Sequence, residues 1–202
     1  MKSFLFVFCF LFVGAVTFSQ KGYDAGYIIK NNGDTVRGKI KDRKYTTSPG
    51  NSDKITFIDE KGNKDKITPN EIKAYCKRGS MFYRTLPVGL EAKKQFVQII
   101  EYGEVILFGY TSNSFVSTAF SSVKPTSSKD NHAISQTDVV YFYQKSKDPN
   151  SLMKVKRDKF ESVSLFYFKD DAKLIKQIED KSLKYQDIEL VVKMYNEFVA
   201  KK

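Results

Sequence analysis

The sequence predicts an α+β fold: a mainly antiparallel twisted sheet or open β-barrel of about eight to ten strands, followed by about two or three helices. Two observations support this. Up to about residue 156, short alternating apolar runs are separated by turn residues such as Asn32-Gly33. After that point, apolar residues recur at helical spacing. We therefore expect a leader at 1–19, a β-rich domain at 20–156 and a helical segment at 157–202 packed on the sheet.

The first predicted hairpin joins strands at 26–30 and 35–40, because an Asn-Gly pair supplies the positive φ angles of a tight turn. Gly38, inside the second strand, predicts a bulge or a close approach of another backbone. A later hairpin, over 94–111, carries apolar residues on both faces, which predicts a pair buried on both sides. The other expected strands are 54–59, 64–68, 72–76, 81–86, 139–143 and 152–155.

A Ser/Thr-rich loop is expected over residues 111–137, where twelve of 27 residues are Ser or Thr. Such a composition buries too little apolar area to order a long segment by itself. Long loops in compact domains are usually functional or disordered. Phe115 and Phe120, which lie within this loop, are therefore candidate binding residues.

The C-terminal segment predicts helices from its caps and its apolar stripe. Asp170 and Asp171 can cap the N-terminus of one helix, and Asp187 can cap the N-terminus of the last helix. Residues 158–168 fit either a helix or a strand, and we expect a helix. The stripe of the last helix consists of Ile188, Val191, Val192, Tyr195 and Val199.

The N-terminus has the three parts of a secretory signal peptide. Met1-Lys2 is basic, residues 4–16 are almost entirely apolar, and small residues precede a cut near Ser19/Gln20. The apolar run is short for a retained anchor, which needs about 20 residues. Cys9 has no small residue before it, which argues against lipid attachment. We therefore expect an exported protein, periplasmic or extracellular, with no membrane span after cleavage.

The chain is basic, with 34 Lys and Arg against 23 Asp and Glu. Five of the basic residues are Arg, the residue that suits bidentate recognition of bases and phosphates. The lysines are spread along the chain among acids, so no specific nucleic-acid partner is expected. A solvated lysine-rich surface is the simplest interpretation, and binding of an anionic polymer or of lipopolysaccharide phosphate is the alternative.

Few chemistries are open to this chain. His132 is its only histidine, and Cys76 is its only cysteine outside the leader, so neither an internal disulfide nor a metal site is expected. Phosphate-loop and dinucleotide motifs are missing, and no cofactor is expected. The catalytic candidates are Cys76 as nucleophile and His132 as base. Alternatively, Cys76 is a half-buried hydrophobe and His132 an exposed polar residue.

Tyr141 and Tyr143 share one face of a predicted strand. If exposed, they would form a stacking platform for sugars or nucleotides. Cross-strand packing of half-buried rings is the alternative.

Several stretches resemble one group of proteins: Gly26-Tyr27-Ile28-Ile29 with Asn32 to Ile40, the Tyr102-Gly103-Glu104 hairpin, and Met194-Tyr195-Asn196. The chain resembles an uncharacterised family of exported β-rich proteins of Bacteroidota. The resemblance implies a sheet built of hairpins and an envelope location, and it carries over no catalytic residue.

We therefore expect a non-enzymatic binding or scaffolding module of the cell envelope, whose partner is an envelope protein or a glycan. The first alternative is a binder of anionic polymer or lipopolysaccharide through surface lysines. The second is a cysteine-dependent enzyme that uses Cys76.

Cleavage of the leader can be tested directly. When the full chain is expressed in a Gram-negative host, the exported protein should have an intact mass that begins at Gln20. A cytoplasmic product that retains Met1 would contradict the prediction.

Overall fold

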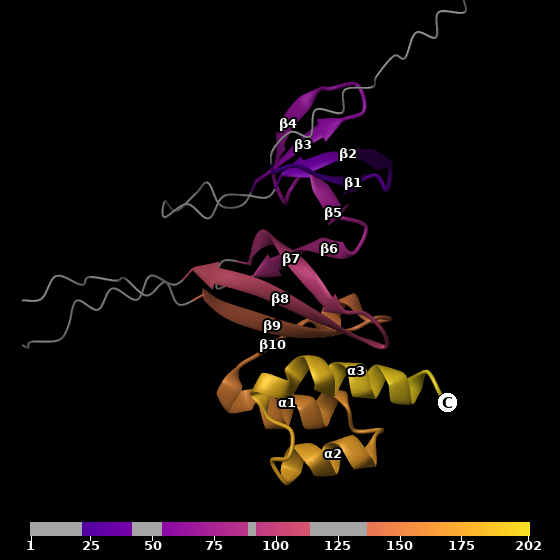
Figure 1. The fold of residues 1–202 in the computed structure, drawn as a ribbon. Coiled ribbons are helices and arrows are strands. Elements are labelled where there is room, and N and C mark those ends of the chain that lie inside the picture. The colour runs from indigo at the N-terminus through magenta and orange to yellow at the C-terminus, as the bar shows by residue number, and fades with distance from the viewer. Residues whose placement is uncertain (1–21, 42–53, 89–91, 114–136) are drawn as a thin grey trace, which may run out of the picture.

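The computed structural model describes residues 22–41, 54–88, 92–113 and 137–202. Within these residues, ten strands form one open antiparallel sheet in the order β10-β9-β8-β7-β6-β5-β1-β2-β3-β4, and three α-helices follow (Figure 1). The α+β prediction is confirmed, in the form of an open sheet and not a closed barrel. No helix of the described ranges is long and apolar enough to cross a membrane.

The strands are β1 (Asp24–Lys30), β2 (Thr35–Lys41), β3 (Ile55–Asp59), β4 (Lys64–Ile67), β5 (Ile72–Lys77), β6 (Met81–Val88), β7 (Lys93–Glu101), β8 (Val105–Asn113), β9 (Thr137–Lys145) and β10 (Met153–Val155). The helices are α1 (Phe160–Tyr167), α2 (Ala172–Glu179) and α3 (Ile188–Val199), and 3-10 turns occupy Pro149–Ser151, Arg157–Lys159 and Tyr185–Asp187. Strands β8 and β9 each reach into the loop expected at 111–137, and residues 114–136, with Phe115, Phe120 and His132, lie outside the described residues.

The helices cover one face of the C-terminal half of the sheet (Figure 1). The core between helices and strands joins Leu107 and Tyr143, both fully buried, to the apolar sides of α2 and α3. The expected stripe of α3 supplies four buried residues and one half-buried residue, Val199. Helical spacing therefore identified the packed face of α3 correctly.

Strands β7 and β8 are buried on both faces, as the sequence predicted. Leu107 faces the helices, while Val97 and Phe108 belong to a second buried cluster on the opposite face. This second cluster comprises Leu86, Val97, Ile106, Phe108 and Phe142.

The N-terminal half has a third core, whose described members are all side chains of the sheet strands. Gly26 and Gly38 face each other across β1 and β2, and the Phe57 ring lies against Gly38. A Cβ on Gly38 would be 2.2 Å from the Ile58 carbonyl oxygen and 2.7 Å from that ring. The close approach predicted at Gly38 is therefore present, and it lets β3 pack tightly on β2.

The first hairpin also forms as predicted, with one difference. The turn has four residues between β1 and β2, and within the Asn32-Gly33 pair only Gly33 has a positive φ, +99°. The Lys30 N–H donates to the Asp34 carbonyl and the Gly33 N–H to the Lys30 carbonyl, so the hydrogen-bonded loop encloses three residues and needs one left-handed position, whereas a type I′ two-residue turn needs two. The Asn32 side chain accepts a hydrogen bond from the Asp34 N–H at 3.0 Å.

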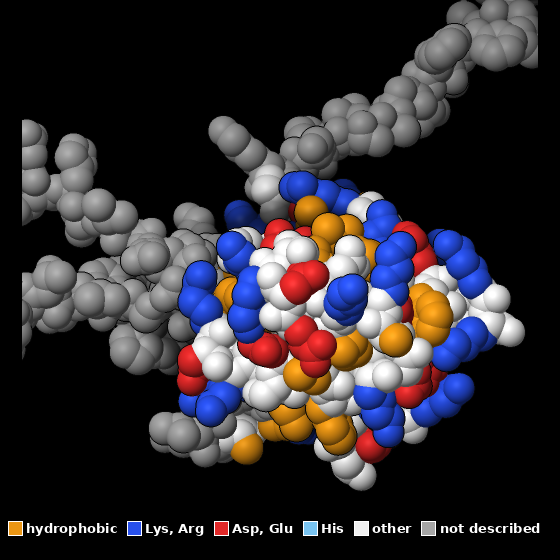
Figure 2. All heavy atoms as spheres, turned by 90° about the horizontal axis from the view of Figure 1, so that it is seen from below, with side chains coloured by type: hydrophobic (Ala, Val, Ile, Leu, Met, Phe, Trp, Pro, Cys, Tyr) orange, Lys and Arg blue, Asp and Glu red, His pale blue; other side chains and the backbone are white. Residues whose placement is uncertain are grey.

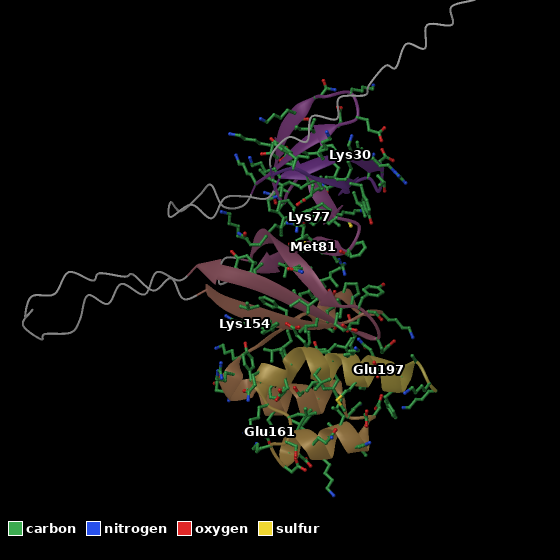
Figure 3. All side chains as sticks on the ribbon, viewed as in Figure 1. Lys30, Lys77, Met81, Lys154, Glu161 and Glu197 are labelled. Carbon is green, nitrogen blue, oxygen red and sulfur yellow. The ribbon has the colours of Figure 1, made fainter. Side chains whose placement is uncertain are left out.

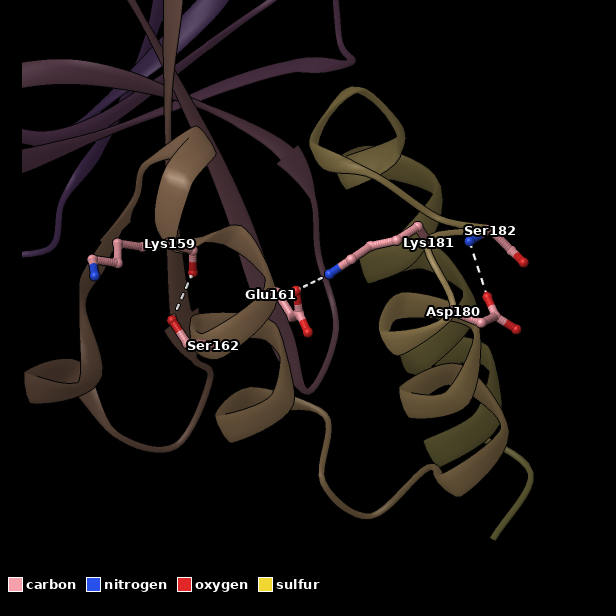
Figure 4. Close-up of polar contacts among 6 residues, drawn as sticks. All are labelled: Lys159, Glu161, Ser162, Asp180, Lys181 and Ser182. Carbon is pink, nitrogen blue, oxygen red and sulfur yellow. Dashed lines mark hydrogen bonds and ion pairs between the residues drawn. The ribbon is translucent and has the colours of Figure 1, made fainter.

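The helix caps agree with the sequence at one position and differ at another. Asp171 caps α2 by accepting a hydrogen bond from the Leu174 N–H. Asp187 precedes α3 but its carboxylate accepts from the Lys184 N–H, 2.8 Å away, inside a 3-10 turn. Glu161 of α1 also forms an ion pair with Lys181, which lies in the turn after α2 (Figure 4).

The close approach at Gly38 predicts that Gly38→Ala lowers the free energy of unfolding by about 1–3 kcal/mol, the usual cost of overpacking. Urea denaturation monitored by far-UV circular dichroism measures the change. Lys39→Ala, at an exposed position of the same strand, should alter stability by less than about 0.5 kcal/mol. Equal stability of Gly38→Ala and wild type would show that β3 does not pack this tightly.

Candidate functional site

A groove of about 570 Å³ crosses the middle of the sheet. Residues of β1, β5, β6 and β7 and of the β7–β8 turn line it. Lys77 and Met81, labelled in Figure 3, mark the turn of the β5–β6 hairpin, between strands β1–β4 and strands β7–β10. The groove thus lies where the two halves of the sheet join.

One end of the groove is aromatic. The strand register aligns Tyr27, Cys76 and Phe82 in one row across β1, β5 and β6. Phe82 is 42% exposed, and Tyr102, in the turn after β7, is 72% exposed. Both rings expose a large apolar surface to solvent. Two exposed aromatic side chains in a concavity are typical of a contact site.

The other end of the groove is basic. Lys73, near the start of β5, and Lys94, near the start of β7, both line it and are exposed. Arg84 lies between them and the aromatic end. None of the described residues that line the groove is Asp or Glu. The groove therefore combines three positive charges with aromatic rings.

Arg84 is held in place by contacts across the sheet. Its guanidinium donates a hydrogen bond to the Gln144 Oε1 of β9 at 3.3 Å and lies 5.8 Å from the centre of the Phe108 ring. Strands β7 and β8 lie between β6 and β9, so Arg84 reaches over two strands. These contacts fix the side chain before any ligand arrives, which lowers the entropic cost of binding.

Tyr102 is positioned by a helix that is distant in sequence. The Asn196 side chain of α3 accepts a hydrogen bond from the Val105 N–H at 3.0 Å and donates one to the Val105 carbonyl at 2.9 Å. Gly103 makes room for this amide, since a Cβ there would be 2.3 Å from the Asn196 Cγ. The turn that carries Tyr102 is therefore anchored to α3.

Cys76 lies beneath the aromatic end and is 1% exposed. Burial raises the pKa of its thiol above the ordinary value of 9.0, against weaker lowering by the Tyr27 hydroxyl and the Gly79 backbone. Burial and the neighbouring thiol raise the pKa of Tyr27 in turn. Lys77, whose own pKa is lowered by burial, is not a cause of the shift at Cys76, and neither is Arg78. The arrangement disfavours the thiolate that a nucleophile requires.

The two candidate tyrosines lie under the helices, away from the groove. Tyr143 is fully buried, with its hydroxyl 3.4 Å from that of Ser164, and offers no ring face to a ligand. Tyr141 is half-buried and donates a hydrogen bond to Glu189 of α3 at 3.3 Å. Both tyrosines therefore pack against neighbouring strands and helices, which is the alternative interpretation and not the stacking platform.

Sequence reasoning missed the groove residues because their proximity depends on strand order. Alternation along a strand places Tyr27 and Ile29 on the same side of β1, and Phe82 and Arg84 on the same side of β6. It does not show that β5 pairs with β1, which brings those strands together.

No known protein family, curated protein or solved structure matches this chain. The described residues also contain no group of three or more His, Cys, Asp or Glu side chains arranged to hold a metal ion.

The raised pKa predicts that native Cys76 reacts with iodoacetamide at least about tenfold more slowly than the same residue in denaturant, because burial disfavours the thiolate and blocks access. Because the pKa is raised, the native rate should continue to increase with pH beyond the point at which the rate of the denatured protein levels off. Mass spectrometry of timed, quenched samples measures both rates. Rapid native labelling at pH 7 would instead indicate an activated thiol.

Proposed function

We propose that this protein is a non-catalytic binding module of the cell envelope and that the groove across β1, β5, β6 and β7 is its contact site. The observation that carries the proposal is the exposure of Phe82 and Tyr102 in a concavity with three basic side chains. Surfaces of this kind bind ligands through apolar contact and charge together.

A binding role suits the groove better than catalysis. The titratable thiol nearest to it, Cys76, is buried with a raised pKa. The described side chains around the groove include no carboxylate that could act as a general base. Aromatic and cationic groups hold a ligand but provide no proton acceptor at neutral pH.

The envelope location rests on the sequence. The apolar leader, with its cut near Ser19/Gln20, is typical of export, and the resemblance to exported Bacteroidota proteins points the same way. Export places the groove in contact with envelope proteins and glycans.

The alternative proposal, attraction of an anionic polymer by lysines all over the surface, has less support. On the helical face, Lys and Arg side chains are interspersed with Asp and Glu (Figure 2). Neighbouring charges of opposite sign largely cancel each other's field, and salt at about 0.1 M screens what remains beyond about 10 Å. A basic surface without acids occurs in the groove, so we assign the anionic contact to that site.

Cosedimentation with an envelope fraction from a Bacteroidota bacterium tests the proposal. The purified mature protein should sediment with the fraction, and Phe82→Ala combined with Tyr102→Ala should reduce the bound amount by about tenfold, the effect expected of two contact aromatics.

The matched control is Phe166→Ala with Leu190→Ala, because these side chains are similarly exposed, 59% and 49%, but lie on α1 and α3. Thermal unfolding should show that both double variants remain folded. If the control pair reduces sedimentation and the groove pair does not, the contact site lies on the helical face and the proposal is wrong.

A further inference from the structure

We infer that the ligand of the groove is an anionic glycan, a linear sugar chain carrying carboxylate or phosphate groups. This inference rests on the proposed function and adds the chemistry of the ligand. It follows from three features of the described residues: the sign of the charge, the separation of aromatic and basic ends, and the protection of the sheet edges.

The charge of the groove calls for an anion. Lys73, Arg84 and Lys94 line it without an acidic partner among the described lining residues. Outside the groove, Lys147 and Lys181 each form an ion pair with an acid, Glu104 and Glu161 respectively. An anion in the groove would therefore meet three basic side chains and no carboxylate among the described lining residues, which favours both steering and affinity.

The two ends of the groove lie far apart. Lys94 is near the start of β7, and Tyr102 follows the end of that strand, eight positions later in the sequence. At about 3.3 Å per residue, their backbones are separated by roughly 25 Å. A ligand that meets both ends must be extended, with ring faces at one end and anionic groups at the other. A sugar chain of several units has this form, whereas an isolated phosphate or carboxylate does not.

An acidic peptide is disfavoured by the way in which peptides bind sheets. They commonly add as a strand at an exposed edge, through main-chain hydrogen bonds. The two edges of this sheet are β4, with the charged sequence Lys64-Asp65-Lys66, and β10, which has three residues. Charged and very short edge strands resist such addition. The groove is lined by inner strands, among them β5 and β6, whose backbone groups already pair with their neighbours, so a ligand there meets side chains.

Isothermal titration calorimetry of the purified mature protein tests the inference with four probes. Oligogalacturonate supplies carboxylates, and a phosphorylated lipopolysaccharide core oligosaccharide supplies phosphates. A malto-oligosaccharide of similar length is the neutral glycan, and oligoglutamate matches the charge of the galacturonate on a peptide backbone. We expect one of the anionic glycans to bind at least about tenfold more tightly than the neutral glycan and oligoglutamate, with affinity that falls as salt rises. Which of the two binds identifies the anion.

Two sets of variants locate the binding. Lys73→Glu with Lys94→Glu should weaken glycan binding by at least about tenfold, because two attractive charges become repulsive. Tyr102→Ala should weaken it by about fivefold or more through loss of stacking. The control is Lys173→Glu with Lys193→Glu, at exposed positions of α2 and α3, which changes net charge equally and should leave the affinity within about twofold.

The outcomes separate this inference from the proposed function. If oligoglutamate binds as well as the glycans, if no glycan binds, or if both lysine pairs have equal effects, the glycan inference is wrong. When one of these results accompanies groove-dependent sedimentation with envelopes, the groove is still a contact site but for a partner of another chemistry. Loss of groove-dependent sedimentation would instead overturn the proposed function itself.

Discussion

The pairing of β5 with β6 is the constraint on which the rest of the structure depends, because it is the link in the described sheet between its N-terminal and C-terminal strands. Arg78 and Gly79 both take positive φ in the connecting turn, and the Arg78 N–H and guanidinium bind back to Ala25 and Asp24 of β1. Beneath the hairpin, Tyr75 and Tyr83 stack with their ring centres 4.5 Å apart. One turn thus orders three strands at once.

The two halves joined by this hairpin bury their apolar residues in different ways. The C-terminal strands have helices on one face, whereas the N-terminal strands pack through their own side chains, with Gly38 allowing the Phe57 ring to lie on β2. At the join, Tyr75 of β5 belongs to the core of the N-terminal half, whereas Leu86 of β6 belongs to the buried cluster that contains Val97 and Phe108. The groove with Phe82 and Tyr102 occupies that place, so the candidate site is a consequence of how the two cores meet.

The spacing of apolar residues along the sequence was enough to predict the strands, the helices and the burial of both faces of the β7–β8 hairpin. Alternation and helical spacing indicate directly which face of an element is buried. It failed where a residue's role depends on a distant partner. The Asn196 amide bonds the Val105 backbone, 91 positions away, and explains why the Tyr102-Gly103 turn contains a glycine. Tyr141 and Tyr143 share a face as expected, but α3 and α1 pack against them. Sequence spacing alone could not place those helices over the strand.

The central claim is that the groove at the join, and not the helical face, contacts the envelope. Hydroxyl-radical footprinting of aromatic side chains, with and without an envelope fraction, measures this most directly. The account predicts that modification of Phe82 and Tyr102 falls several-fold on binding, while that of Phe166, which is 59% exposed on α1, stays the same. Protection of Phe166 with Phe82 and Tyr102 unchanged would contradict it.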